Sequence, residues 1–525
     1  MPRNYFRTTL IFLIFSELLS IFAWLLPEFN LAVFLFILAI TLILSLKKLE
    51  YGILIAWSEL IIGSYGYLFS LEYGSTLISV RLGIFMVVMF AWLCHIVKNG
   101  GLKSYWLELK TFKFFKYYVA LAIILVWGFV WGIVRANDFG NVFLDFNNWL
   151  FFLYLLPLIT VSKKEIFWPN LKQVALAALT WLIIKTILLL YIFSHQFIWA
   201  LPEVYQWIRD IRIGEITMMG NNFYRIFLQS QIFALLAFFI LLPLNKNKSL
   251  IILSLTTVII SFSRSFWLGL TVGFCIYGLY LLLYQRKQIL KQISKIVVIA
   301  VLSLAIIFVI IILPPKISGD SLGSLISKRA TEIEAAGSSR INMLKPLAES
   351  IIKHPVIGSG FGATVTYKSV DQRLLATTAG ASGEYTTYAF EWAYLDLLLK
   401  IGLVGVFVYL LLIFKILQIL WQNILNKNDY PPTGDPPSPV RKIPNRKLGD
   451  ELRIIPLRGI PLHQSGKFQT ENWGTDYGLR LGIFLALISL LAVNIFTPYL
   501  NHPLGIGFIL ISSIYAQSFN RHRHL

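Results

Sequence analysis

The stretch TTLIFLIFSELLSIFAWLL, residues 8–26, carries one charged side chain, Glu17, in a run that is otherwise almost entirely apolar. An α-helix of this length can cross the ~30 Å hydrocarbon core of a bilayer. The run follows Arg3 and Arg7, as the apolar part of a signal peptide does, but residues 27–30 show no small-residue cleavage pattern and a second apolar run begins directly. We therefore expect an uncleaved first membrane-spanning helix.

Apolar runs of similar length recur along the whole chain. Of its 525 residues, 57% are hydrophobic and only 14% are charged, which is more apolar surface than a soluble core needs. The sequence therefore predicts an all-α polytopic membrane protein with about 12–14 transmembrane helices and a large external loop that contains short amphipathic helices. The predicted spans are residues 8–26, 30–46, 52–69, 82–97, 118–135, 148–161, 173–193, 226–244, 249–262, 266–284, 296–314, 402–421, 479–497 and 503–519.

The charge of the chain follows this topology. Basic residues outnumber acidic ones by 46 to 26, for a formal net charge of +20. The excess lies in connections on the same side as Arg3 and Arg7, such as residues 98–116 and 245–249. By the positive-inside rule this side is the cytoplasm, and an even number of spans places both termini there. The basic charge thus points to membrane lipids as partners and not to nucleic acid.

The connections divide the chain into regions. On the external face the long connections are residues 136–147, 195–225 and 315–401, whereas the cytoplasmic residues 422–478 are rich in proline and basic side chains, as flexible segments near an anionic leaflet are. We expect N-terminal spans at 1–209, a core with the external loop 315–401 at 210–421, a flexible cytoplasmic loop at 422–478 and C-terminal spans at 479–525.

The external loop contains the sequence SSRINMLKPLAESIIKHPVIGSGFG, residues 338–362. The apolar residues Leu344, Leu347, Ile351 and Ile352 have helical spacing, so we expect an amphipathic helix at the membrane interface that Arg340 opens. The following GSGFG lacks the preceding strand of a dinucleotide-binding or P-loop motif. We interpret it as a turn that only glycine can form, with direct phosphate contact as the alternative, and we assign no chemical role to His354, which precedes the turn.

Three arginines are predicted on the external face. Arg264 lies between two apolar runs in SFSRSFWLGL (261–270), Arg225 lies where the external connection enters a span, and Arg340 opens the helix of the loop. Each alone is explained by an arginine that extends from a helix end to the interface. Together they indicate a cationic site for an anionic, lipid-linked group, because the planar guanidinium donates two hydrogen bonds to phosphate and stays charged.

The order of three segments resembles the O-antigen ligase and polymerase superfamily over roughly residues 210–420. The segments are FSRSFWLGL (262–270), SRINMLKPLAESIIKHPVIGSGFG (339–362) and YAFEWAYLDLLLKIGLVGVFVYLLL (388–412). The resemblance implies a glycosyltransferase of the bacterial inner membrane that needs no metal or cofactor. Such an enzyme moves a glycan from an undecaprenyl-diphosphate donor to a hydroxyl of a glycan or lipid-linked acceptor on the outer face. The resemblance also implies that Arg264 and Arg340 bind the diphosphate, with Arg225 a weaker match.

The chain departs from this family at one position. The ligases usually carry a histidine shortly before the segment that reads YLDLLLKIGLVG here, and this chain has Glu391 in that place. The acceptor hydroxyl loses a proton as it attacks the anomeric carbon, so Glu391 is the candidate base. The alternative is that Glu391 pairs with Arg340 or caps the next helix. The missing histidine favours a polymerase, or a broader exopolysaccharide function, over a ligase.

Aromatic residues and buried charges complete the set of candidates. The aromatic residues near Glu391 suit an interfacial belt or sugar stacking; they are Tyr385, Tyr388, Trp392 and Tyr394. Charged residues inside spans are costly in lipid, so we expect Glu17, Glu59 and Lys185 to face the bundle interior, where they pair or line a pathway, and Arg81 and Arg135 to reach the interface. Cys94 and Cys275 lie in apolar runs and suggest neither a disulfide nor a metal site.

Two functions other than glycosyl transfer stay open. Some relatives in the superfamily are described as involved in bicarbonate uptake, and arginines also suit a small anion. A transporter favours inverted repeats and broken helices that meet at the midplane, and the sequence shows neither clearly. An inactive subunit of an envelope assembly is the other possibility, which the missing histidine favours.

Overall fold

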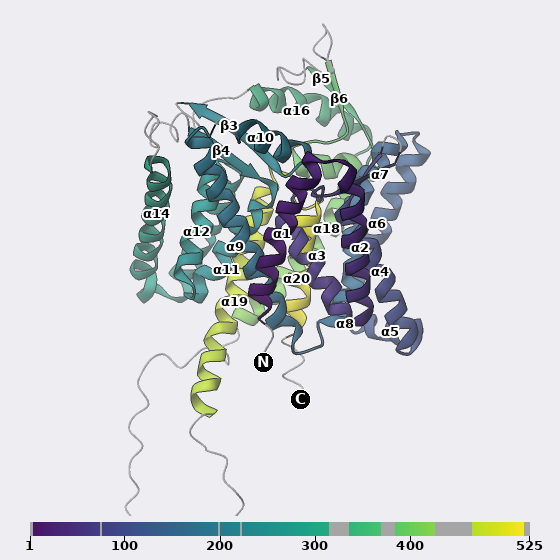
Figure 1. The fold of residues 1–525 in the computed structure, drawn as a ribbon. Helices are drawn as coiled ribbons and strands as arrows, with labels where there is room; N and C mark the ends of the chain where they lie inside the picture. Colours follow the sequence, from purple (N-terminus) through teal and green to yellow (C-terminus); the bar gives the residue numbers. More distant parts are fainter. Residues whose placement is uncertain are drawn as a thin grey trace, which may run out of the picture.

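The protein folds as a bundle of apolar helices in which most helices run between the same two ends (Figure 1). The computed structural model describes residues 4–73, 76–197, 200–220, 223–313, 335–368, 384–425 and 465–518. The start of the first helix and the end of the last lie at one end, which we call the terminal end. The opposite end carries the β-hairpins, and we call it the hairpin end.

Nine helices of the described residues are long and apolar enough to cross a membrane. They are α1 (Tyr5–Leu25), α2 (Glu28–Lys47), α4 (Val80–Lys98), α6 (Phe115–Val134), the run of α7 (Phe139–Trp149), η1 (Leu150–Tyr154) and α8 (Leu155–Val161), α9 (Phe167–Ser194), α13 (Arg264–Tyr284), the run of η3 (Arg286–Gln288) and α14 (Ile289–Ile312), and α18 (Ala393–Leu425). Shorter apolar helices pack among them: α3 (Leu49–Ile62), α11 (Ile232–Leu244), α12 (Lys248–Ile260), the apolar part of α19 (Ser465–Val493), and α20 (Pro503–Ser518). This is the all-α polytopic membrane fold that the sequence predicts, and each of the predicted spans coincides with one of these helices or runs.

Some boundaries differ from the prediction for identifiable reasons. The predicted span 52–69 is too long because Ser64 and Gly66 adopt left-handed backbone conformations (φ 52° and 88°) just after α3 ends. The predicted span 226–244 begins too early because its first residues form a strand. The last external loop ends sooner than expected, because α18 starts at Ala393 and continues through an interruption at Gly402, where φ is 65°.

Three antiparallel hairpins lie at the hairpin end, and no pattern in the sequence predicted them. They are β1 (Ser70–Tyr73) with β2 (Thr76–Ser79), β3 (Gly214–Gly220) with β4 (Phe223–Leu228), and β5 (Val365–Lys368) with β6 (Glu384–Thr387). Two further helices lie at this end, α10 (Leu201–Asp210) and α16 (Ala335–Lys353). The connections at the terminal end, which include the short helix α5 (Gly101–Lys110), carry many lysines: Lys47, Lys48, Lys98, Lys103, Lys110, Lys163, Lys164, Lys246 and Lys248.

Charged residues inside the bundle are paired. Lys185 Nζ lies 2.5 Å from Glu17 Oε1, so these two residues of α9 and α1 neutralise each other. Arg81 binds Glu59 through Nε and Nη2 at 2.9 and 3.0 Å. The expectation that Arg81 reaches the interface is therefore wrong, because its side chain is buried against a carboxylate on α3. Arg135, by contrast, is exposed at the end of α6.

Two expectations fall partly outside the described residues. The flexible loop at 422–478 is described only at its two edges, and the external loop at 315–401 only from Ala335 to Lys368 and from Glu384 onward. The division of the chain into four regions remains an expectation.

Cys94 and Cys275 are both free thiols.

Candidate functional site

The junction between α12 and α13 is one edge of the candidate site. It consists of Ser261, Phe262 and Ser263, and Arg264 is the first residue of α13 at the hairpin end. Phe262 is fully buried and has a left-handed backbone (φ 46°), an arrangement that costs free energy in a non-glycine residue and often occurs at functional sites. A hydrogen bond of 2.9 Å between the hydroxyls of Ser265 and Thr497 fixes the start of α13 to the segment that follows α19. Arg264 itself is exposed.

The β3–β4 hairpin packs over this junction. Its register places Thr217 opposite Arg225 and Glu215 opposite Phe227, so these four side chains share one face of the hairpin. Arg225 Nε donates to the carbonyl oxygen of Ser261 at 2.9 Å, and its guanidinium lies over the Phe227 ring at 5.0 Å. The Phe227 ring in turn contacts Phe266 of α13 at 5.8 Å between ring centroids.

A separate small core forms the third edge of the candidate site. We call this part the cap, and it consists of α16, residues 354–364, β5 and β6. Its buried side chains include Met343 and Leu347 of α16 with Val365 of β5. The predicted amphipathic helix exists, but Ile352 is exposed and Met343 takes the buried position. Arg340 of α16 forms an ion pair with Glu391, which lies between β6 and α18.

The three predicted arginines come together at the hairpin end. Burial lowers the pKa of Arg340, and the positive charges of Arg225 and Arg264 lower it further, whereas Glu215 raises it. Such coupling requires the charges to lie close together in a partly desolvated place. Arginine stays protonated in proteins, so the three positive charges together would attract an anion. We call Arg225, Arg264 and Arg340 the arginine cluster.

The carboxylate of Glu391, the candidate base, has a charged partner. Glu391 is half exposed, and its carboxylate is engaged by Arg340, which was the alternative interpretation of the sequence. The neighbouring Trp392 also contacts Arg340, because its Nε1 donates to the carbonyl oxygen of Arg340 at 2.9 Å. The Trp392 ring lies 5.2 Å from the ring of Phe496. The ion pair agrees with this alternative, and the role of Glu391 as the base stays a prediction.

A buried charge triad, which the sequence prediction missed, lies beside the cap. Lys400 Nζ is 2.7 Å from Asp145 Oδ1 and 2.7 Å from Asp396 Oδ1. Asn501 donates to the other oxygen of Asp396 at 2.8 Å, and the amide of Gly362 donates to Asp145 at 2.8 Å. Only the spacing of Asp396 and Lys400, one helical turn apart, was visible in the sequence. The triad joins α7, α18, the turn before α20 and the cap.

The glycine turn fits into the interruption of α18. Gly358, Gly360 and Gly362 all have left-handed backbones, with φ of 74°, 82° and 74°. The amides of residues 359 and 360 donate to the carbonyl oxygens of Leu399 and Lys400 at 2.6 and 3.1 Å, and residue 361 donates to Gly128 at 2.9 Å. Since the Gly362 amide is also engaged, these four N–H groups are not available to a phosphate. The turn is structural, as the simpler interpretation held.

The other aromatic candidates pack against the protein. The rings of Tyr385 and Tyr367 lie 5.9 Å apart within the cap, and the hydroxyl of Tyr394 donates to Leu491 at 2.9 Å. Tyr388 lies over Lys400 at 5.9 Å from Nζ to the ring centroid. His354 is half-buried, and its backbone amide donates to Ile351 at 3.1 Å. Among the described residues, no group of three His, Cys, Asp or Glu side chains could hold a metal ion.

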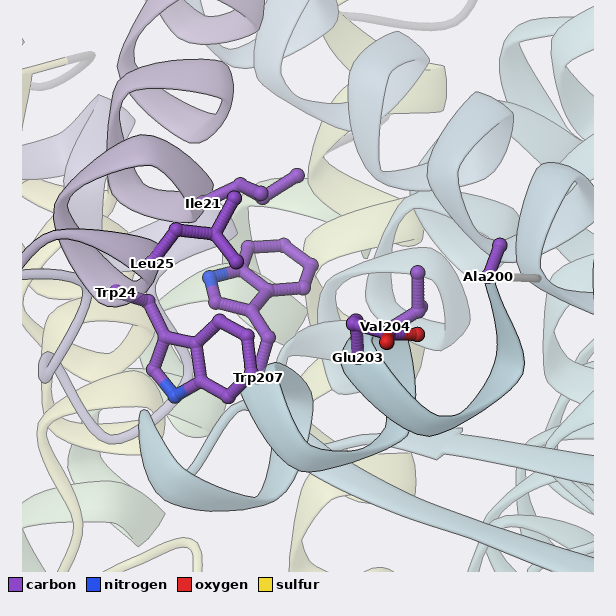
Figure 2. Close-up of a pocket in the computed structure, with 7 residues that line it drawn as sticks. All are labelled: Ile21, Trp24, Leu25, Ala200, Glu203, Val204 and Trp207. Atoms are coloured by element: carbon purple, nitrogen blue, oxygen red, sulfur yellow. The ribbon is translucent and has the colours of Figure 1, made fainter.

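An apolar groove of about 250 Å³ opens between the end of α1 and α10. Figure 2 shows Trp24 of α1 and Trp207 of α10 with their rings near each other, and Ile21, Leu25 and Val204 beside them. The indole Nε1 atoms are held by Asp210 at 3.0 Å and by Ser20 at 3.3 Å. Among the described residues that line the groove, only Glu203 is charged, so this lining suits hydrocarbon better than a diphosphate.

Fold and site together define a polytopic α-helical membrane protein that gathers three arginines at one membrane face. Residues 249–410 match the family model described as O-antigen ligase. This match supports the resemblance to the O-antigen ligase and polymerase superfamily. The match includes Arg264, Arg340 and Glu391 but not the β3–β4 hairpin with Arg225. The search of curated proteins found no match.

Proposed function

We propose that this protein is a glycosyltransferase of surface-polysaccharide assembly that polymerises or ligates glycans carried on undecaprenyl diphosphate. The observation that carries the proposal is the convergence of Arg225, Arg264 and Arg340 in a chain that matches the O-antigen ligase family model. Glu391 occupies the place of the ligase histidine, so we favour the polymerase, in which the acceptor is another lipid-linked repeat unit.

The chemistry explains why arginines gather there. When an acceptor hydroxyl attacks the anomeric carbon, the bond from that carbon to the diphosphate oxygen breaks and negative charge develops on the leaving group. Guanidinium groups bind phosphate oxygens in pairs and keep their charge when water is excluded. Cations fixed in position before the reaction stabilise this developing charge without reorganisation, and this is the role that we assign to the arginine cluster.

The charge of the two ends supports a location for the reaction. Lysines are frequent in the connections of the terminal end, and cytoplasmic loops carry such an excess. We therefore assign the terminal end and both chain termini to the cytoplasm of a bacterial inner membrane, and the hairpin end with its arginine cluster to the outer face. A donor whose lipid lies in the outer leaflet would present its diphosphate at this level.

The interrupted helix α18 is the one feature that favours an anion transporter instead. Interrupted helices that expose backbone and a cation bind ions in several transporters. In this protein, however, the glycine turn satisfies the carbonyl oxygens at the interruption, and two carboxylates engage Lys400. The interruption is filled by the protein's own groups, so glycosyl transfer is the better supported function.

The arginine cluster predicts a specific defect in cells. In a deletion strain, Arg264→Ala and Arg340→Ala are expected to lower chain synthesis by about 10²–10³-fold each, the usual loss when one charge-stabilising donor is removed. Single lipid-linked repeats should accumulate while wild type makes long chains. The measurement is the length distribution of surface polysaccharide together with the pool of lipid-linked repeats, at matched protein abundance.

Arg135→Ala is the matched control, because Arg135 is exposed at the end of α6 and belongs to the same membrane face without joining the cluster. It should leave chain length unchanged. Normal chains from both cluster variants would rule out the proposed site. If the variants lose small-anion uptake but make normal polysaccharide, the transporter is favoured. If the wild-type protein extends no chain itself but another protein needs it for activity, the assembly subunit is favoured. Transfer to an acceptor other than a repeat unit would identify a ligase.

A further inference from the structure

We infer that Glu215, and not Glu391, is the general base that takes the proton from the acceptor hydroxyl; this inference rests on the proposed glycosyl transfer. Glu215 lies in β3, outside the region that matches the family model. Its position emerges only from the pairing of β3 with β4.

The register of the hairpin places Glu215 beside the arginine cluster. Glu215 faces Phe227 across the strands, and Arg225 is the next residue on the same face of β4, diagonal to Glu215. Diagonal side chains of an antiparallel pair are within reach of each other when they are long. Because Phe227 packs on Phe266 and Arg225 binds Ser261, this face is directed at the junction where Arg264 begins.

Glu215 also interacts electrostatically with the cap. Its negative charge acts on Arg340 and opposes the effect of the two other arginines there. Glu215 is thus diagonal to Arg225 of the hairpin and interacts electrostatically with Arg340 of α16. A carboxylate in this position lies next to the place where a diphosphate would bind.

The two candidate carboxylates differ in whether they are available. Glu391 is held by Arg340, and an ion-paired carboxylate is a weaker proton acceptor. Glu215 is exposed, and no hydrogen bond or ion pair joins its carboxylate to another residue in the described part of the chain. The absence of a direct partner leaves its oxygens free to accept a proton from a bound substrate.

The proposed step balances without any further reactant. The acceptor hydroxyl oxygen forms a bond to the anomeric carbon, and the hydroxyl proton moves to a Glu215 carboxylate oxygen. The bond from the anomeric carbon to the diphosphate oxygen breaks, and its electron pair leaves with undecaprenyl diphosphate, whose charge the arginine cluster stabilises. Glu391 keeps a positioning role, since it orients Arg340 across the cap.

The test uses the full-length protein in lipid nanodiscs with a lipid-linked repeat unit as substrate and the release of undecaprenyl diphosphate as readout. Glu215→Gln keeps the size of the side chain and removes its basicity, so kcat should fall by about 10²–10⁴-fold, the usual contribution of a general base. Affinity for undecaprenyl diphosphate, measured by thermal stabilisation of the protein, should equal or exceed that of wild type, because a negative charge beside the diphosphate is removed. A merely unfolded variant would not bind. Glu215→Asp should recover part of the rate.

Two comparisons make the result decisive. Glu72→Gln is the matched control, because Glu72 is an exposed carboxylate on another hairpin of the same end, and it should leave kcat unchanged. Glu391→Gln should weaken affinity for the lipid diphosphate more than it lowers kcat. If Glu215→Gln keeps a wild-type kcat, the inference is overturned while the proposed function stands. If wild type itself releases no undecaprenyl diphosphate, the proposed function fails.

Discussion

Lys400→Met is expected to destabilise the protein by about 3–5 kcal/mol, because it leaves two buried carboxylates without their cation. Lys400 is only 4% exposed, and its ammonium group lies 2.7 Å from both Asp145 and Asp396. Methionine has a similar length, so the substitution removes charge with little change in packing. The measurement is the thermal unfolding of detergent-solubilised protein, followed by tryptophan fluorescence.

The loss should be reversible by removing the opposing charges. Lys400→Met combined with Asp145→Asn and Asp396→Asn leaves no buried charge at the site and should recover most of the stability. Lys415→Met, in the same helix, is the control, because Lys415 is half-buried and interacts with Gln418 instead of a carboxylate. A Lys400→Met protein that unfolds at the same temperature as Lys415→Met would show that the triad contributes nothing to stability.

The triad also connects stability with the candidate site. Asp145 accepts from the amide of Gly362, so the same carboxylate that pairs with Lys400 holds the end of the glycine turn. The turn leads from α16, which carries Arg340. Substitutions in the triad should therefore lower polysaccharide synthesis as well as stability, unlike substitutions in the arginine cluster, which are expected to affect synthesis alone.

The membrane fold could be predicted from the sequence because hydrophobicity is a local property of each span. The hairpins could not, since Ser70–Ser79 and Gly214–Leu228 are short and lie in polar connections where alternation is weak. The arginine cluster was predicted because three arginines were expected on one face, two of them at span ends and one at the start of the loop helix. Its members come together only through tertiary contacts, and their roles stay proposals.

Glu215 and Asp145 were missed for a common physical reason. A single acidic residue in a polar connection carries no local signal, and its importance depends on what the fold places next to it. Asp145 lies 255 residues before Lys400 in the chain. Glu215 and Arg340 lie in separate elements, β3 and α16, and interact only in the folded protein. Glu391 was visible because the family pattern marks its position, but the pattern could not show that Arg340 engages it.

Gly360→Ala is expected to displace the cap from the bundle. Gly360 has a left-handed backbone, which costs an L-residue about 1–2 kcal/mol. A Cβ atom there would also lie 2.5 Å from the Cα of Gly132 and 2.9 Å from the carbonyl carbon of Trp131, both of them backbone atoms of α6. Backbone cannot move aside as a side chain can, so the overlap adds about 1–3 kcal/mol or more.

The defect should be confined to the contact between the cap and the helix bundle. The Gly360 amide donates to the carbonyl oxygen of Lys400, and that hydrogen bond breaks if the turn shifts away from α6. Limited proteolysis should therefore cut the cap while the helical content of the bundle, measured by circular dichroism, stays near wild type. Gly278→Ala is the control, because among the described residues no atom outside the local helix backbone lies within 4 Å of where its new methyl group would be, and alanine favours the helix α13. Equal protease resistance of the two variants would mean that the cap does not depend on the glycine turn, and that the contacts of Arg340 with Glu391 and Trp392 suffice to hold it.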